Sequence, residues 1–260
     1  MENIFDMFFT NLLEANLKVK NFAHEIIYYT VTKSTTDDIW ELYNETGQTK
    51  ALIITDNQTA GKGRNNNKWI SQPSKSITCS FILEQIFNDE QVSLYSILIP
   101  VSIIKGIKNF SQIDLQIKWP NDIVYKNKKV GGILIESKLR KNISIFNIGI
   151  GLNVNENNFD FPEDLRGNVT SLKEIKEIPI QREPLLASIL NELEQLINNP
   201  DNNYLIEYWI KHCNHINKKV SFNISNKKMQ GIFKGINNKG QAIIEKGDET
   251  ITYNNPITIL

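Results

Sequence analysis

Residues 114–155 contain four apolar runs of strand length that are separated only by short polar turns. The runs cover residues 114–118, 123–125, 130–137 and 142–155. Turns this short join strands that pair antiparallel, because a parallel crossover needs about a dozen residues or more. Since helical patterns flank this series of strands, it predicts an α+β fold: a mixed, mainly antiparallel sheet with flanking helices.

The helical patterns are segments whose apolar side chains recur every three or four residues. Pro184 near the start of one segment and Pro200 just after it are typical helix boundaries, with Pro184 suited to the first helical position. Pro100 falls inside another segment, where we expect a kink. The predicted helices cover residues 91–110, 183–199 and 204–213, and an amphipathic helix is predicted within residues 1–22.

Residues 215–260 differ from the rest of the chain, because short apolar runs alternate there with Asn/Gly turns. This pattern predicts a small β-barrel-like domain. We therefore divide the chain into a helical extension (1–24), a main domain (25–214) and a C-terminal β domain (215–260). The extension is too short for a helix-turn-helix DNA-binding domain, which needs about three helices.

The charges of the chain balance, with 29 Lys and Arg against 29 Asp and Glu. No global field favours nucleic acid or a membrane surface, so any anion site has to be local. The two cysteines suggest no disulfide framework, and a reducing cytoplasm is expected. No apolar run has the length of a membrane span, and the early acids of the N-terminus make it a poor signal peptide.

The loop from Gln58 to Trp69 combines two glycines, three cations and a tryptophan between two apolar runs. Glycine allows a ligand to approach the backbone closely, while Lys62 and Arg64 lie beside free backbone N–H groups, a combination that suits a phosphate. The loop is not a P-loop, because it lacks the G-x-x-x-x-G-K-[ST] pattern. A solvated basic hairpin loop is the plain alternative.

Two other short motifs are ambiguous. Ser34 or Thr35, followed by Asp37 and Asp38, fits a helix N-terminus that could hold a small polar ligand, or could simply be capped. The string from His212 to His215 lacks four ligands at a usable spacing, so we expect no metal site there.

Five motifs, in this order and at compatible separations, resemble the bacterial biotin–protein ligase family over about residues 25–260. They are Ser34-Thr35-Thr36, Gln58-Thr59-Ala60-Gly61-Lys62-Gly63-Arg64, Lys118-Trp119-Pro120-Asn121-Asp122, Lys129-Val130-Gly131-Gly132-Ile133-Leu134-Ile135-Glu136 and Gly149-Ile150-Gly151-Leu152-Asn153-Val154-Asn155. The resemblance implies a class II synthetase-like catalytic domain with an SH3-like C-terminal β domain, of the monofunctional type without a DNA-binding domain.

The resemblance also implies a two-step reaction. Biotin's carboxylate attacks the α-phosphate of ATP, which Mg²⁺ accompanies, and gives biotinyl-5′-AMP and pyrophosphate. A lysine of a biotin carboxyl carrier domain then displaces AMP. The family needs no covalent nucleophile, so stabilisation of the phosphate charge is the main task, and Arg64, Lys118 and Lys129 are the implied catalytic residues.

Carried over by position, the implied biotin-binding and ATP-binding residues fall in all five motifs. Ser34, Thr35 and Gln58 would frame the ureido ring, Arg64 and Lys129 would hold the reacting anions, and Trp69 would pack on the adenine. The biotin-binding set is Ser34, Thr35, Thr36, Gln58, Lys62, Gly63, Arg64, Lys129 and Gly132. The ATP-binding set is Arg64, Trp69, Lys118, Asn121 and Asn153. Asp122 would help the metal or close its turn, and no residue is assigned as a resident metal ligand.

The chain departs from the family pattern in the proposed site. Thr36 stands where the family usually has Asn, which removes an expected hydrogen bond. Lys62 stands where Arg is usual, which keeps the charge but loses the guanidinium fork. Residues 65–67 are three asparagines in place of a more basic, glycine-containing segment, and residues 73–76 lack a glycine often found there.

Other functions remain open on the sequence alone. A lipoate or octanoate ligase shares the fold, but its arginine-rich, glycine-triplet motif is missing here. A catalytically weak biotin-binding protein would be expected to have lost Arg64 or Lys129, and a generic nucleotide-binding scaffold does not explain the whole ordered set. An exposed strand edge could pair two copies in a homodimer, or pair one copy with the carrier domain.

Overall fold

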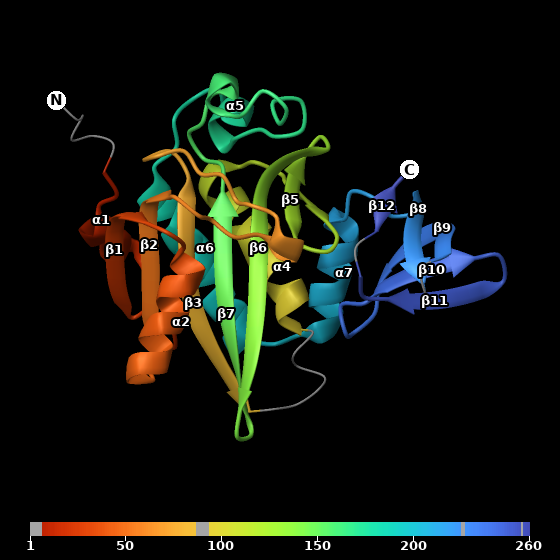
Figure 1. Cartoon of the computed structure of the whole chain (residues 1–260), viewed down its shortest axis with the longest axis horizontal. Helices are drawn as coiled ribbons and strands as arrows, with labels where there is room; N and C mark the ends of the chain where they lie inside the picture. The colour runs from red at the N-terminus through yellow and green to blue at the C-terminus, as the bar shows by residue number, and fades with distance from the viewer. Residues whose placement is uncertain (1–6, 87–93, 225–226, 256) are drawn as a thin grey trace.

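The computed structural model describes residues 7–86, 94–224, 227–255 and 257–260. These residues form a large sheet with helices on both faces and a smaller sheet beside it (Figure 1). The helices are α1 Thr10–Asn16, α2 Thr35–Thr46, α4 Leu94–Ser111, α5 Leu172–Lys176, α6 Arg182–Asn198 and α7 Asn202–His212, with single 3₁₀ turns η2 Arg64–Asn66 and η3 Asn158–Asp160.

The large sheet has seven strands in the order β1-β2-β3-β7-β6-β5-β4. The first two strands pair in parallel, and each of the other neighbours is antiparallel. The predicted mixed, mainly antiparallel sheet is therefore confirmed. Its strands are β1 Glu25–Thr32, β2 Ala51–Gln58, β3 Ile77–Ile86, β4 Gln116–Lys118, β5 Asp122–Tyr125, β6 Lys128–Arg140 and β7 Ile143–Leu152.

Helices cover both faces of the central strands, with α2 on one face and α4 and α6 on the other (Figure 1). Successive side chains of a strand point to opposite faces, and the two hydrophobic clusters follow this alternation. Ile53 of β2 packs with Ile39 and Trp40 of α2, whereas Leu52 and Ile54 belong to the cluster around α4 and α6. Burial on both faces explains why the run 51–55 is continuously apolar rather than alternating.

The predicted helices are present, with shifted ends. The helix α6 begins at Arg182, so Pro184 is its third residue rather than its first; the N–H that proline lacks is still one of the four that a helix leaves free. Pro100 lies buried inside α4. The predicted starts of two helices, residues 1–6 and 91–93, fall outside the described residues.

The segment before the first strand packs on the body of the protein. Its helix α1 is shorter than predicted because the chain is extended again from Leu17. Phe8, Leu13 and Phe22 are buried in the main cluster. The backbone N–H groups of Phe9 and Lys20 donate to Glu183 and Glu194 of α6, at 2.9 and 3.1 Å. The buried apolar residues of this segment therefore complete the core, while Met7, Phe9 and Leu12 remain exposed.

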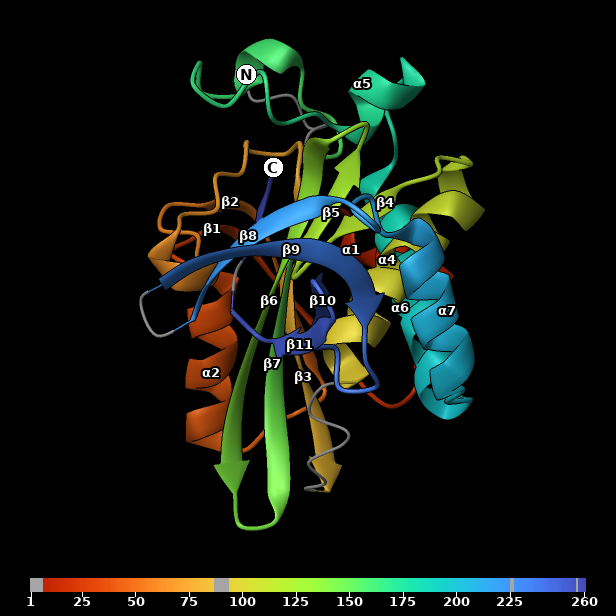
Figure 2. The same cartoon turned by 90° about the vertical axis from the view of Figure 1, so that its right-hand side faces the viewer.

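The C-terminal residues form a five-stranded sheet in the order β11-β10-β9-β8-β12, which faces the viewer in Figure 2. All its neighbouring strands are antiparallel, which fits the predicted SH3-like β domain. None of the described helices is long and apolar enough to cross a bilayer. The strands are β8 Lys219–Ile224, β9 Lys227–Ile236, β10 Ala242–Lys246, β11 Glu249–Tyr253 and β12 Thr258–Ile259.

Candidate substrate-binding site

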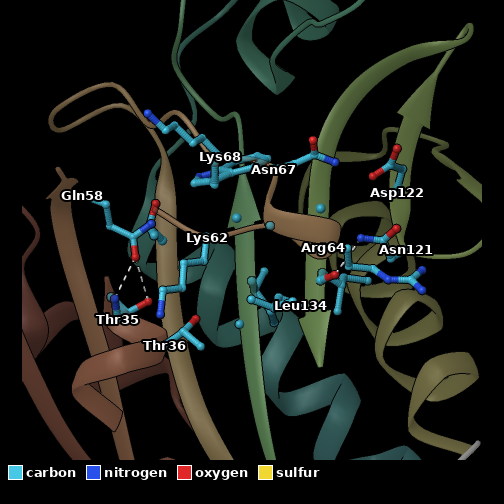
Figure 3. A pocket seen from close by; sticks show the side chains of 18 of the residues that line it. Thr35, Thr36, Gln58, Lys62, Arg64, Asn67, Lys68, Asn121, Asp122 and Leu134 are labelled. Carbon is cyan, nitrogen blue, oxygen red and sulfur yellow. Dashed lines mark hydrogen bonds between the residues drawn. The ribbon is translucent and has the colours of Figure 1, made fainter. Parts of the chain in front are cut away.

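A cavity of about 220 Å³ lies where the start of α2, the loop between β2 and β3, and the ends of β5, β6 and β7 meet (Figure 3). The strand order places β3, β7, β6 and β5 side by side, so motifs far apart in the sequence converge on one face. Of the predicted site residues, those that line it are Thr35, Thr36, Gln58, Lys62, Gly63, Arg64, Trp69, Asn121, Lys129 and Gly132.

One end of the cavity is a network of hydroxyl and amide groups. The Gln58 Oε1 accepts from the backbone N–H of Thr35 at 2.8 Å and from its hydroxyl at 3.2 Å. The Thr35 hydroxyl is also 2.8 Å from Ser80 Oγ, and Thr36 Oγ1 is 3.4 Å from the same atom. Since the carbonyl of Gln58 is already used, its Nε2 donors are the groups that this end can offer to a ligand.

Ser34 does not belong to this network. It occupies the N-cap position of α2, but its side chain forms no capping hydrogen bond. Its hydroxyl is fully buried and has no partner among the described residues. The predicted side-chain cap is therefore wrong for Ser34, and its side chain is not part of the cavity wall.

Lys62 and Arg64 point to opposite sides of the cavity (Figure 3). Lys62 reaches toward α2 and forms an ion pair with Asp37. Arg64 points toward Asn121 and is half-buried, and its guanidinium has no hydrogen bond or ion pair with another described residue. Burial lowers the pKa of Arg64, and the charge of Asp122 opposes this shift. An unpaired guanidinium at this position favours an anionic ligand.

The three asparagines after Arg64 have a local structural explanation. Arg64 to Asn66 form a single 3₁₀ turn, which the N–H of Asn67 closes on the carbonyl of Arg64 at 3.1 Å. Within it, Asn65 has a φ of 53°, in the left-handed region where Asn is several-fold enriched. The N–H of Gly63 donates to Asn67 O at 2.8 Å, so the loop is folded onto itself without a ligand.

Lys129 is held by Asp122 from the neighbouring strand, with Nζ 2.6 Å from Oδ1. Both side chains line the cavity, and Lys129 Nζ lies 5.9 Å from the centre of a Trp69 ring. Asp122 thus does more than close the turn of the Lys-Trp-Pro-Asn-Asp motif. It fixes the position of the cation that an incoming carboxylate or phosphate would meet.

Trp69 forms the far wall, and glycines make room for it. A Cβ atom added to Gly151 would lie 2.6 and 2.8 Å from Cζ2 and Cδ2 of the indole, and closer still to Cε2. At Gly61 it would lie 2.7 Å from Gln58 Nε2 and also clash with the backbone carbonyl of Trp69. Real Cβ atoms do not approach this closely, so these glycines are required by packing. The indole Nε1 is buried without a partner among the described residues.

Besides Ser34, two more predicted residues do not line the cavity. The Asn153 side chain is buried and donates to Thr170 O at 3.0 Å, so it holds a loop rather than facing the cavity. Lys118 lies near His215 at the junction with the C-terminal sheet. The pKa of His215 is lowered to about 4, mainly because the ring is buried and secondly because Lys118 is positively charged. Neither side chain lines the cavity.

Residues 212–215, where we expected no metal site, lie at the end of α7. His215 Nδ1 lies 3.3 Å from Cys213 Sγ and 2.8 Å from Asn214 Oδ1. In the part of the chain that the structure describes, no three or more His, Cys, Asp or Glu side chains are grouped to hold a metal ion. These side chains bond to one another at the end of α7.

Several residues at the cavity were not among the predictions: the wall residues Lys68, Thr78 and Leu134, and Ser80 behind the wall. Thr78 and Leu134 line the cavity, while Ser80 supports the hydroxyl network beneath it. One signal was available, because Ser76, Thr78 and Ser80 alternate with apolar residues along β3, which places the polar residues on one face. Leu134 lies in the fourth quoted motif and Lys68 is one of the three cations of the loop, but neither was assigned to the site.

The cavity offers three chemical environments in sequence. The amide and hydroxyl groups of Thr35, Thr36 and Gln58 lie at one end, the apolar side chain of Leu134 lies in the middle, and Arg64 lies at the other end (Figure 3). A molecule with a polar head, an apolar middle and an anionic end matches this order. Arg64 could also stabilise charge that develops on a phosphate at that end.

Comparison with known proteins agrees with this arrangement. Residues 28–155 match the family model described as Biotin/lipoate A/B protein ligase family. The Bifunctional ligase/repressor BirA of Bacillus spizizenii is 35% identical over 175 residues, which cover 67% of this chain and 54% of that protein. The Biotin–protein ligase of Homo sapiens is 30% identical over 190 residues, 70% of this chain and 26% of that protein. The chain thus spans about half the length of its Bacillus relatives.

Among solved structures, the biotin protein ligase from Aquifex aeolicus in complex with biotin and ATP superposes with a TM-score of 0.74 at 23% identity. The superposition covers 91% of this chain and 100% of that one. The biotin protein ligase from Leishmania major in complex with biotin gives a TM-score of 0.64 at 20% identity, over 90% and 99% of the two chains. These similarities confirm the predicted α+β fold class.

Proposed function

We propose that this chain, whose residues 28–155 match the biotin/lipoate A/B protein ligase family model, is an ATP-dependent biotin–protein ligase. It would form biotinyl-5′-AMP and transfer biotin to a lysine of a biotin carboxyl carrier domain. The names of the Bacillus and human relatives, and the biotin and ATP bound to the Aquifex aeolicus protein, support this proposal.

The observation that carries the proposal is the difference between the two ends of the cavity. Biotin has a polar ureido ring, an aliphatic chain and a carboxylate. The Thr35–Gln58 network offers donors to the ring, and the Arg64–Lys129 end offers positive charge to the carboxylate. Lipoate and octanoate lack the ureido group, and they would leave this polar end without partners at a cost of about 1–3 kcal/mol per buried group.

In the first step a biotin carboxylate oxygen bonds to the α-phosphorus of ATP, and the bond from that phosphorus to the bridging oxygen breaks. The bonding electrons leave with pyrophosphate, and no proton is needed. Two anions have to approach each other, which the charges of Arg64 and Lys129 make less unfavourable. Lys129 would exchange its contact with Asp122 for one with the reacting groups.

In the second step the amine of the carrier lysine bonds to the carbonyl carbon of the mixed anhydride, and AMP leaves. The amine loses a proton as the amide forms. Mg²⁺ would enter with ATP, held mainly by its phosphates, since Mg²⁺ is often bound through only one or two carboxylates plus substrate phosphates. Asp122 and the side-chain oxygen of Asn121 are the cavity groups suited to it.

The proposal also includes the cellular location and the partners of the enzyme. It would act in the cytoplasm, with no DNA or membrane partner. The outer edge of β1 is the end of the large sheet. That edge is a candidate surface for a homodimer, or for pairing with the carrier.

The test is mass spectrometry of the small molecules formed when the purified protein is incubated with Mg-ATP and biotin, with lipoate and octanoate in parallel. We expect biotinyl-AMP and no other acyl-adenylate. Lipoyl- or octanoyl-AMP would assign the chain to the sister activity of the family. Bound biotin without an adenylate would make it a binding protein.

A further inference from the structure

The predicted site residue Asn153 does not line the cavity, yet its contacts lead to Lys129. Its backbone N–H donates at 2.8 Å to the carbonyl of Val130, the residue after Lys129. Its side-chain Nδ2 donates to the carbonyl of Thr170 at 3.0 Å, and its own carbonyl accepts from the N–H of Leu172 at 3.1 Å. Asn153 is buried, and it thus joins β6 to the segment that leads into α5.

Residues 168–170 of that segment hold the backbone of Lys129. The N–H of Lys129 donates to the carbonyl of Asn168 at 2.8 Å, and the carbonyl of Lys129 accepts from the N–H of Thr170 at 2.9 Å. The two hydrogen bonds form an isolated parallel β-bridge. The residue pairs between β7 and β6 end at Gly131, so this segment takes the place of β7 beside Lys129.

Thr170 connects the two sets of contacts. Its carbonyl accepts from the Asn153 side chain, while its N–H donates to the carbonyl of Lys129. Only one residue therefore separates the amide of Asn153 from the backbone of Lys129. A shift of Thr170 would move the start of β6, and with it the direction of the Lys129 side chain.

Lys129 needs a fixed backbone because its side-chain contact is temporary. Its Nζ lies 2.6 Å from Asp122 Oδ1 in the structure. Under the proposed function the ammonium leaves this carboxylate for the reacting anions, and the ion pair then no longer fixes its direction. Lys129 also lies beside an irregularity of the sheet, because it pairs with Val124 where the register between β5 and β6 shifts. Such bulges re-aim side chains and are frequent next to active sites.

We propose that Asn153 is a positioning residue for Lys129: its side chain holds Thr170, and Thr170 holds the backbone of Lys129 so that the ammonium meets the biotin carboxylate and the α-phosphate. The inference rests on the proposed function, in which Lys129 supplies charge to the reacting anions. A displacement of about 1 Å in such a group can slow a reaction by about 100-fold.

The test compares Asn153→Ala with Asn155→Ala. Asn155 is a matched control because its Nδ2 donates to the carbonyl of Ile180 at 2.8 Å, and its Oδ1 accepts from the N–H of Ile180 at 2.9 Å. This is a clamp of the same kind on a residue other than those that bond to Lys129. Asn153→Ser, which keeps a hydroxyl donor on a shorter side chain, is the milder second variant.

The first readout needs no activity. Hydrogen–deuterium exchange, resolved by NMR, follows the backbone N–H groups of Lys129 and Thr170, which both donate within the clamp. We expect Asn153→Ala to speed the exchange of both groups by about tenfold, because local opening of the segment becomes easier. Asn155→Ala should leave both exchange rates unchanged, and Asn153→Ser should fall between the two.

The second readout is the rate of biotinyl-AMP formation in single turnovers. We expect Asn153→Ala to slow it by about 10- to 100-fold while the KM for ATP changes by less than about threefold, and Asn155→Ala to leave it unchanged. In a Lys129→Ala background, Asn153→Ala should add little further loss, because the two residues act through the same group.

Two results would overturn the inference and leave the proposed function intact. One is exchange and adenylation in Asn153→Ala that match those of Asn155→Ala. The other is a raised KM for ATP, or an equally large further loss in the Lys129→Ala background, which would mean that Asn153 acts on the nucleotide itself. If the unaltered chain forms no biotinyl-AMP, the proposed function and the role of Lys129 in it are both refuted.

Discussion

Replacing Gly151 with alanine tests whether the Trp69 indole forms the nucleotide wall of the site. The added Cβ would lie 2.6 Å from Cζ2 and 2.8 Å from Cδ2 of the indole. Carbon atoms in contact prefer a separation of about 3.5–4.0 Å, so the ring has to retreat by about 1 Å. It is not free to do so, because the N–H of Trp69 donates to Gly61 O at 2.9 Å and its carbonyl abuts Gly61.

Such overpacking costs about 1–3 kcal/mol, which corresponds to about 5- to 150-fold in an equilibrium constant. If Trp69 contacts the adenine, most of this free-energy cost weakens the binding of ATP. We therefore expect the KM for ATP to rise by about 10- to 100-fold in Gly151→Ala, while the dissociation constant of biotin without nucleotide changes by less than about threefold.

The assay is biotin-dependent pyrophosphate exchange for ATP, with calorimetry for biotin. Two other glycines provide controls. A Cβ at Gly167 would meet nothing within 4 Å, so Gly167→Ala should be neutral. A Cβ at Gly149 would lie 3.1 Å from Thr36 Oγ1, so Gly149→Ala should weaken biotin binding more than ATP binding.

A double-mutant cycle with Trp69→Ala decides whether the clash is the cause. Once the indole is removed, Gly151→Ala should add little further loss. Equal effects of Gly151→Ala with and without the indole would refute the reasoning, as would an unchanged KM for ATP in the single variant.

Three further predictions concern charge. Arg64→Ala should slow adenylate formation by at least about 100-fold in a single-turnover assay, because a preorganised charge is lost, and a near-normal rate would contradict the site assignment. Asp56→Ala should lower the free energy of unfolding in urea by about 3–5 kcal/mol, because it removes the buried carboxylate that lies 2.6 Å from Arg182; an effect no larger than that of breaking the exposed Lys234–Glu245 pair would argue against a buried ion pair. Glu156 is buried, which raises its pKa to about 7, so the folded state holds a proton that the unfolded state releases near pH 4.5. Stability should therefore fall as the pH rises through this window, by an amount on the order of 3 kcal/mol, and Glu156→Gln should remove the dependence in urea titrations at several pH values.

The sequence alone was sufficient for the layout of β4 to β7 within the large sheet. The four-residue turns between residues 114 and 155 leave no room for crossover helices, so β4 to β7 had to pair antiparallel in chain order. The β-rich C-terminal domain likewise follows from short apolar runs broken by Asn/Gly turns, although its last strand β12 was not predicted. The sequence determined the ends of the helices less well. The helix α1 ends before Leu17, and α6 begins two residues before Pro184. Packing, rather than helix propensity, decides where a helix begins or ends.

The sequence also indicated the chemistry of the site, because residue types such as Arg64, Lys129 and Gln58 carry it locally. It did not reveal which of them face the same space. Asn153 and Lys118 lie in matching motifs, yet one holds a loop and the other lies beside His215. The direction of a side chain depends on the strand it sits on and on that strand's neighbours, which motif spacing does not specify.

Three features were decided only by the tertiary structure. Ser80 supports Thr35 because β3 passes beneath the start of α2. Gly151 has to be glycine because a loop more than eighty positions earlier places Trp69 against it. The turn that contains Gly240 is held against the main domain because Trp119 Nε1 donates to the carbonyl of Gly240. Each depends on contacts between residues far apart in the chain, whereas local patterns determine strands, turns and the chemistry of single side chains.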